Sequence, residues 1–356
     1  MSDKLIQVIE GINPIDKKWE KKAKEYLDNL AIPRGSLGEL LNLAEQLAGI
    51  QQTIKPCVAN KHVIVMAGDH GVVEEGVSAF PQEVTPQMVE NFVKNGASIN
   101  VLSEVVGAKV TVVDMGIAQN MDTLVEKNQI LSRKIDYGTK NMTLGSAMTR
   151  EQARAALLAG IEIVEEIIKK QGANLIATGD MGIGNTTPSS AILSVMTGKE
   201  VSEVTGRGTG IDDNKLLNKI RVITKAIEVN NPKKDDPIDV LAKVGGFEIA
   251  GIAGVILGAA YYKVPVVVDG FISTAGALIA KGLNKNTVDY MIASHKSIEE
   301  GHKIMWKELG LSPILDLKFR LGEGTGAVLA MNIVEAAAQV INKVLTFEQA
   351  GVSENE

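Results

Sequence analysis

The sequence predicts an α/β fold, in which a Rossmann-like parallel sheet is flanked by helices. From residue 61 onward, short runs rich in β-branched residues alternate with helical stretches, a pattern that favours parallel strands joined by helical crossovers. Four of these runs lead into a polar loop that carries an aspartate. The chain has 356 residues, of which 45% are hydrophobic and 35 are glycine, so it can bury a large core and form close ligand loops at strand ends.

Both ends of the chain have helical periodicity instead. We expect amphipathic helices over residues 17–30 and 36–52, separated by a short segment with proline and glycine. Because Ser36 and Glu39 have the spacing of a capping box, we expect the second helix to begin at Ser36. A long apolar helix is expected over residues 327–345.

An aspartate follows each of four predicted strands. The strands cover residues 62–67, 109–113, 174–177 and 264–268, and the aspartates are Asp69, Asp114, Asp180 and Asp269. Ligands of an open parallel sheet bind just beyond the carboxyl ends of its strands, so these four side chains could rim one crevice. The alternative for each aspartate is that it caps a loop or the next helix.

The loop from Thr178 to Ser190 has the composition of an anion-binding site. It contains three glycines; an asparagine and two threonines stand directly before Pro188, and an apolar helix follows. Glycines let the backbone approach a ligand closely, and the free amides of the first helical turn point at it. We expect Thr187 to be the N-cap and Pro188 the first helical residue. The alternative is an ordinary tight turn between strand and helix.

A second glycine-rich loop, Leu321 to Ala327, holds a carboxylate immediately before the long apolar helix. Burial of Glu323 in this loop would raise the pKa of its carboxyl, so that it could act as a base near neutral pH. The alternative is a first-turn glutamate that only complements the helix dipole.

Composition argues against several classes of protein. The formal net charge is −6 and no basic stripe is present, which argues against a nucleic-acid partner. The most apolar segment, residues 249–260, is too short to span a bilayer, and we expect no membrane partner. With a single cysteine, Cys57, and no signal-peptide core, the expected location is cytoplasmic.

The four histidines show no metal-ligand spacing with the cysteine or with one another; they are His62, His70, His295 and His302. We therefore expect no metal site and no bound cofactor. We expect the last two to be single histidines on the surface.

Residues 266–276 resemble the diphosphate-sugar motif of the classical phosphoribosyltransferases, in which an apolar strand is followed by two acids and a threonine-rich phosphate loop. Asp269 matches the first acid, but Gly270 stands where the second would be. This departure argues against the classical magnesium-dependent chemistry.

Seven segments together resemble one family over nearly the full chain. They are residues 68–73, 76–85, 96–100, 178–190, 206–213, 245–251 and 321–326. On these segments the chain is identified as a member of the nicotinate-nucleotide–dimethylbenzimidazole phosphoribosyltransferase family, which serves the cobalamin lower-ligand pathway. The resemblance implies an α/β nucleotide-binding catalytic domain over 61–327, a small helical domain built from 1–60 plus 328–356, and a homodimer.

The resemblance also implies the reaction. Family members transfer phosphoribose from nicotinate mononucleotide to 5,6-dimethylbenzimidazole, with inversion at the anomeric carbon, and release nicotinate and α-ribazole 5′-phosphate. By motif, Glu323 is the general base. Asp180 stands where the family pattern has a glutamate with a supporting role, and its side chain is one methylene shorter.

The remaining site residues also follow from the resemblance. The expected ligands of the nucleotide 5′-phosphate are Gly182, Gly184, Asn185, Thr186, Thr187 and Lys219, and for Lys219 the alternative is a solvated helix lysine. The expected pocket for the aromatic base comprises Ser78, Phe80, Gln87, Met181 and Leu321, with Gln82 as an alternative to Gln87.

Two other functions stay open at this point. One is a phosphoribosyltransferase that uses another purine-like or phenolic base. The other is a regulatory protein that kept the nucleotide-binding fold without turnover. A glutamate suited to act as a base argues against the second.

Overall fold

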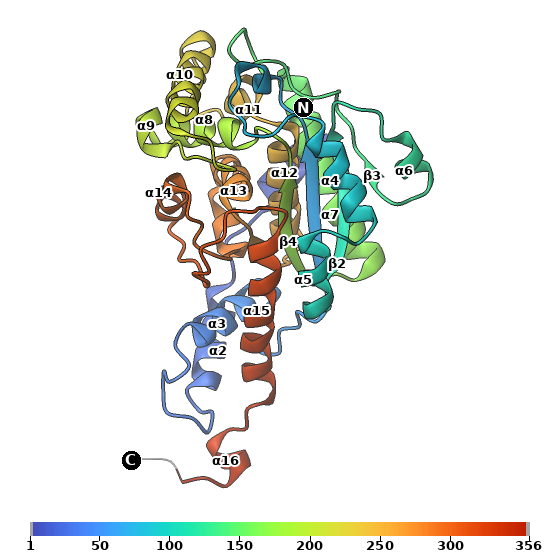
Figure 1. Ribbon diagram of the computed structural model, residues 1–356. Helices are drawn as coiled ribbons and strands as arrows, with labels where there is room; N and C mark the ends of the chain where they lie inside the picture. The colour runs from blue at the N-terminus through green and yellow to red at the C-terminus, as the bar shows by residue number, and fades with distance from the viewer. Residues whose placement is uncertain (1–2, 354–356) are drawn as a thin grey trace.

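The computed structural model describes residues 3–353 and confirms the α/β class, with a single parallel sheet between two layers of helices (Figure 1). The strands are β1 (Lys61–Gly68), β2 (Lys109–Gly116), β3 (Leu131–Ser132), β4 (Leu175–Met181), β5 (Val266–Val268) and β6 (Met291–Ala293). Their order in the sheet is β3-β2-β1-β4-β5-β6, and each neighbouring pair is parallel. The strand order therefore reverses between β1 and β4, where sheets of this kind bind ligands.

The first layer of helices covers one face of the sheet and forms the larger core. Its helices are α1 (Asp3–Gly11), α7 (Arg150–Gln171), α8 (Thr186–Thr197), α10 (Asp213–Asn230), α11 (Pro237–Val244), α12 (Phe247–Tyr261), α13 (Phe271–Leu283) and α14 (Glu300–Leu309). Side chains alternate along a strand, so Ile64 and Met66 of β1 point into this core.

The second layer packs on the opposite face, against Val63 and Val65 of β1. It contains α2 (Lys17–Leu27), α3 (Glu39–Gln51), α4 (Val84–Val93), α5 (Ser98–Val106) and α15 (Thr325–Lys343). The shorter helices are η1 (Gly71–Glu75), α6 (Asp122–Glu126), α9 (Val201–Val204), η2 (Lys285–Tyr290) and α16 (Phe347–Ala350). None of the helices between residues 3 and 353 is long and apolar enough to cross a membrane.

Helix α15 starts at the sheet and runs down beside α2 and α3, which pack on it and on each other (Figure 1). Helix α1 packs elsewhere, on α12 and α7. The division into a small helical domain and a catalytic domain stays a prediction.

Two predicted helix starts are wrong. Helix α3 begins after Gly38, which caps it without a side-chain hydrogen bond, so the expected capping box at Ser36 does not form. Helix α8 has Asn185 as its N-cap and begins at Thr186, so Pro188 is its third residue rather than its first. A proline fits there because the amides of the first turn have no partner within the helix in any case.

Candidate active site

A cavity of about 350 Å³ lies at the carboxyl ends of β4, β5 and β6, beside the point where the strand order reverses. It is lined by the segment that follows β4, by one side of α4, by residues 270–272 and by the loop before α15. A narrower cavity of about 30 Å³ adjoins it and shares residues 182–183, 185–186 and 208–209 as lining. Together they offer one wide and one narrow compartment.

The loop before α15 has a strained backbone. Gly322, Glu323 and Gly324 have φ angles of +88°, +62° and +91°, so three successive residues are left-handed. Glycine adopts this conformation freely, but glutamate does so at a cost, and such residues persist only where the surroundings hold them.

Asp269, directly after β5, fixes the conformation of this loop by hydrogen bonds. Its Oδ1 accepts hydrogen bonds from the amides of Gly326 and Ala327, both at 2.9 Å, and its Oδ2 accepts one from the amide of Gly324 at 3.1 Å. The carboxyl is fully buried at the N-terminus of α15, where free amides and the helix dipole favour an anion. Burial raises the pKa of Asp269, and His295 and these amides oppose that rise.

Two of the other strand-end aspartates also accept hydrogen bonds from loop amides. Asp69 accepts from the amide of Ala118 at 2.8 Å, and Asp114 accepts from the amide of Ile117 at 2.9 Å. Of the four, only Asp180 lines the cavity, so the prediction of a shared crevice is wrong for the other three, which brace loops. Both oxygens of Asp269 accept hydrogen bonds from amides. Asp269 is therefore not free to act as the first acid of a diphosphate-sugar motif.

Asp180 and Glu323 both line the wide cavity, and they are 4% and 5% exposed. Asp180 Oδ2 accepts from Asn185 Nδ2 at 3.0 Å, whereas Asp180 Oδ1 and Glu323 Oε2 have no hydrogen-bond partner in the described part of the chain. Within residues 3–353, neither carboxyl forms an ion pair with a cationic side chain. Buried carboxyls without a cation are costly, and this pair is available to a ligand.

Burial is the main cause of the shifted acidity of both groups. It raises the pKa of Glu323, the charge of Asp269 adds to that rise, and the amide of Ile99 opposes it. The pKa of Asp180 lies well above its ordinary value because of burial and the nearby charges of Asp269, Glu248 and Glu323. Groups shifted in this way are typical of catalytic sites.

The narrow cavity collects most of the residues expected around a phosphate. It is lined by Ser78, Gly182, Gly184, Asn185, Thr186 and Lys219. Arg207 and Gly208 line it as well; they belong to the segment 206–213 that carries the family resemblance, but they were assigned no role from the sequence. Thr187 lines neither cavity, and its buried hydroxyl has no hydrogen-bond partner among the residues that the structure describes.

Lys219 is 1% exposed, so the alternative of a solvated helix lysine is wrong. Its Nζ donates to Thr186 Oγ1 at 2.7 Å, which aims the ammonium at the loop that follows β4. Burial lowers the pKa of Lys219 to about 8, and the charge of Glu299 limits the decrease.

The wide cavity has an apolar wall. Of the predicted base-pocket residues it contains Phe80, Met181 and Leu321, whereas Ser78 lines only the narrow cavity. Gln87 is exposed on α4 and lines neither cavity, and neither does Gln82. Helical spacing explains the difference, because Val84 and Met88, four residues apart, present one face of α4 to the cavity and Gln87 turns away from it.

Several other lining residues were not predicted from the sequence, among them Phe271, Ile272, His295, Ser297 and Arg320. The expectation of surface histidines is wrong, since His295 and His302 are 3% and 0% exposed. Their ring nitrogens bond to nearby side chains in the core, which no local pattern reveals.

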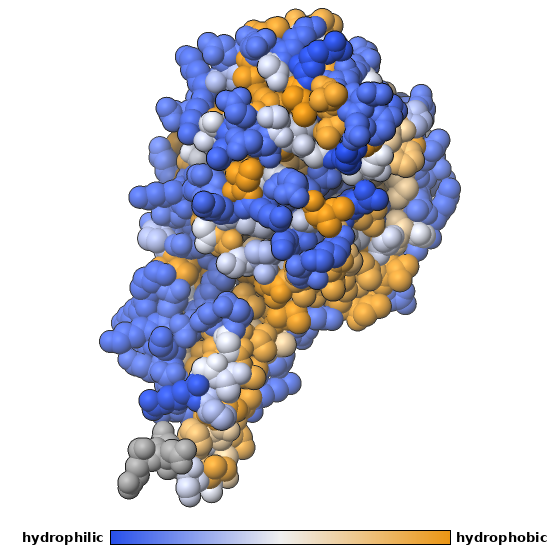
Figure 2. Space-filling model, turned by 60° about the vertical axis from the view of Figure 1, so that its left-hand side comes forward, coloured by the Kyte–Doolittle hydropathy of each residue, from blue (hydrophilic) through white to orange (hydrophobic). Residues whose placement is uncertain are grey.

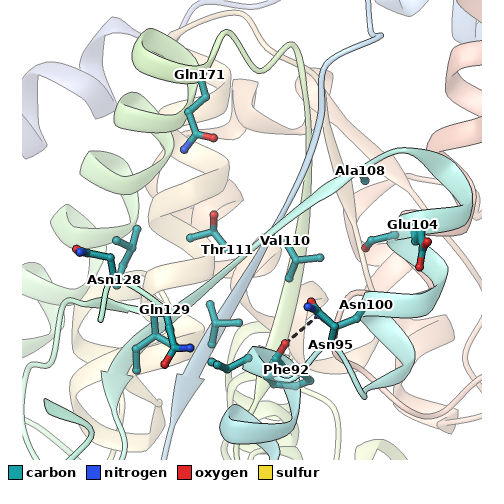
Figure 3. Close-up of a pocket in the computed structure, with 15 residues that line it drawn as sticks. Phe92, Asn95, Asn100, Glu104, Ala108, Val110, Thr111, Asn128, Gln129 and Gln171 are labelled. Carbon is teal, nitrogen blue, oxygen red and sulfur yellow. Dashed lines mark hydrogen bonds between the residues drawn. The ribbon is translucent and has the colours of Figure 1, made fainter. Parts of the chain in front are cut away.

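A separate groove of about 650 Å³ lies along residues 110–112 of β2, which precede the part of that strand that pairs with β3 (Figure 3). Carboxamides such as Asn100 and Gln129 point into it from α5 and from the segment before β3, around Val110 of β2. It contains none of the residues predicted for the site, so the compartments at the strand ends are the candidate active site.

The chain is similar to known phosphoribosyltransferases over most of its length. A family model described as phosphoribosyltransferase matches residues 12–352. The nicotinate-nucleotide–dimethylbenzimidazole phosphoribosyltransferase of Syntrophotalea carbinolica is 53% identical over 345 residues, which cover 97% of each chain. The enzyme of that name from Geobacter sulfurreducens is 51% identical and covers 99% of each. A crystal structure of the enzyme of that name from Thermus thermophilus superposes with a TM-score of 0.90 at 41% identity, covering 96% of this chain and all of that one.

Replacing Asp269 by asparagine tests the hold on the loop before α15. The amide keeps the shape but loses the charge, and its NH₂ group faces amide donors, so we expect the free energy of unfolding to fall by about 2–3 kcal/mol. Urea denaturation followed by circular dichroism measures it. Asp316→Asn, at an exposed aspartate, is the control and should change that free energy by less than about 0.5 kcal/mol. Equal stability of the two variants would contradict the assignment.

Proposed function

Because the chain belongs to the nicotinate-nucleotide–dimethylbenzimidazole phosphoribosyltransferase family, we propose that it transfers phosphoribose from nicotinate mononucleotide to 5,6-dimethylbenzimidazole, with inversion at the anomeric carbon. The products are nicotinate and α-ribazole 5′-phosphate. The observation that carries this proposal is the pair of buried carboxyls, Asp180 and Glu323, each with an oxygen that has no partner and each lining the wide cavity.

The charges of the substrate match the two compartments. Nicotinate mononucleotide carries an anionic phosphate at one end and a cationic pyridinium nitrogen on the ribose. The phosphate fits the narrow cavity, where Lys219 and Arg207 supply positive charge and the amides around Gly184 are close at hand. The pyridinium and the cationic transition state fit beside the two carboxyls, which have no cation of their own among the described residues.

Glu323 acts as the general base in this proposal. The benzimidazole attacks the anomeric carbon through one ring nitrogen, and Glu323 accepts the proton that its other nitrogen must lose. The bond between ribose and pyridinium breaks with its electron pair on nicotinate, which leaves without needing a proton. The raised pKa of Glu323 suits it to accept a proton near neutral pH.

Asp180 takes a supporting role. Its partly satisfied carboxyl stands behind the reacting ribose, and the positive charge that develops there favours its ionised form. The incoming base lies against the apolar wall formed by Phe80, Met88 and Leu321, which suits flat methylated rings. Nucleophile and leaving group then occupy opposite faces of the ribose, as inversion requires.

We also propose that the protein is a homodimer in the cytoplasm. Large apolar side chains are exposed at two places. Val105 on α5 is 72% exposed, and Leu321 and Phe80 at the cavity mouth are 56% and 49% exposed. Figure 2 shows hydrophobic residues forming a continuous area where the body narrows into the lower helices. A single cysteine fits a reducing compartment. Light scattering should give twice the chain mass, and a monomer would contradict the dimer.

The reaction is tested by mixing the protein with nicotinate mononucleotide and dimethylbenzimidazole in the presence of a chelator and following nicotinate release. Glu323→Gln should lower kcat by about 100-fold or more, because proton transfer to this group is lost. The Kd of the nucleotide should rise by no more than about threefold, because Asp180 still faces the pyridinium and the phosphate contacts are unchanged. Glu162→Gln, on the exposed side of α7, is the matched control and should keep wild-type turnover. Full activity of Glu323→Gln would exclude it as the base, and no nicotinate release with any benzimidazole or phenol would exclude the reaction.

The KM for the nucleotide should depend on pH through Lys219. Its lowered pKa of about 8 means that the ammonium is present below that pH and is lost as the pH rises through it. We expect KM to be flat below pH 8 and to rise above it. Lys219→Gln should raise KM by about 10- to 100-fold and remove the rise. A rise at the same pH in Lys219→Gln would assign it to another group.

A further inference from the structure

Two glycine-flanked segments that the proposed reaction leaves without a role meet behind the phosphate loop. Residues 68–71 comprise the last residue of β1 and the three that follow it, and residues 245–248 comprise the two residues before α12 and its first two. His70 Nε2 lies 2.9 Å from Glu248 Oε1, and the two side chains are 1% and 0% exposed. Burial lowers the pKa of His70, but the charge of Glu248 and the hydrogen bond to it, with Asp69, outweigh burial and raise the pKa overall. The two side chains are therefore joined by a buried hydrogen bond.

The His70 ring forms the surface on which the phosphate loop rests. A Cβ at Gly182 would lie 2.2 Å from the Gly68 carbonyl oxygen and 3.5 Å from His70 Nε2, so the loop packs on this segment without room for a side chain. Glu248 fixes the ring, because within residues 3–353 the His70 side chain has one hydrogen bond, the one to Glu248, and His70 Nδ1 has no partner. Gly246 is required as well, since a Cβ there would lie 2.5 Å from His70 Cε1.

Asp69, in the same segment, contacts Thr85 of α4, and Thr85 binds Ile183, the next residue of the phosphate loop. The amide of Ile183 donates to Thr85 Oγ1 at 3.0 Å. The Thr85 hydroxyl in turn contacts Asp69, where it opposes the rise that burial causes in the pKa of that carboxyl. Asp69 and His70 thus act on adjacent residues of the loop, one through Thr85 and the other by direct packing.

We propose that Asp69, His70, Thr85 and Glu248 are positioning residues for the phosphate of the nucleotide. None of them lines either cavity, so they act through the backbone of the loop after β4. By holding residues 182 and 183, they keep the amides of the loop and the start of α8 directed at the narrow cavity. This inference rests on the proposed function, because it assumes that a phosphate binds there.

A comparison of two ligands tests the inference without turnover. Nicotinate riboside differs from nicotinate mononucleotide only in lacking the phosphate. The Kd of the riboside divided by the Kd of the mononucleotide therefore measures the contribution of the phosphate to binding. Calorimetry on the full chain gives both constants. We expect Thr85→Val, which keeps the shape and removes the acceptor, to reduce this ratio by about tenfold, the equivalent of one lost hydrogen bond. Thr85→Ser should restore it.

His70→Gln and Glu248→Gln should reduce the ratio in the same direction. The matched control is His62→Gln, another buried histidine, at the opposite end of β1, where it bonds to Thr111. It should leave the ratio within about twofold. A purely structural role would weaken both ligands equally and leave the ratio unchanged, and that result would overturn the inference, as would a wild-type ratio in Thr85→Val. If the wild-type protein itself does not prefer the mononucleotide, the proposed phosphate site fails instead.

Discussion

The site depends on one buried carboxylate. Asp269 binds three amides at the start of α15, and this fixes the distance between the end of β5 and the loop that carries Glu323. With that end held, the left-handed residues 322–324 have no freedom to relax, and Glu323 is presented to the cavity. Because α15 continues down beside α2 and α3, the same contact joins the sheet to the lower helices. An interaction that stabilises the fold therefore also sets the geometry of the site.

The cavity is built from groups that the protein leaves unsatisfied. Asp180 and Glu323 are almost fully buried, and each retains an oxygen without a hydrogen bond. Lys219 is buried as well, and its pKa is lowered toward neutrality. Such groups reduce the stability of the folded chain, and a ligand with an anion at one end and a cation near its centre would compensate both sets of charges. The electrostatic layout thus favours a zwitterionic nucleotide over a neutral one.

The sequence pattern predicted those parts of the fold that depend on residues close together in the chain. Strands β1, β2, β4 and β5, the glycine loops around Glu323 and Gly184, and the general course of the helices follow from apolar periodicity and from glycine placement, whereas the short strands β3 and β6 were not predicted. What failed depended on contacts between distant residues. Asp269 binds amides 55 to 58 residues further along the chain, His295 and His302 are buried by such contacts, and the phase of α4 turns Gln87 outward. The placement of Ser78 and Thr187 likewise depends on how the segments pack, and the roles of the site residues stay predictions.

The most direct test of this account is the turnover number of Asp269→Asn at a temperature where circular dichroism shows the variant to be folded. Glu323 is intact in this variant, and only the hold on its loop is lost. We predict that kcat falls by about 100-fold, since misplacement of a catalytic group by about 1 Å has that effect, while the Kd of the nucleotide stays within about threefold. A folded Asp269→Asn protein that turns over at the wild-type rate would contradict the claim that Asp269 positions Glu323, the proposed base.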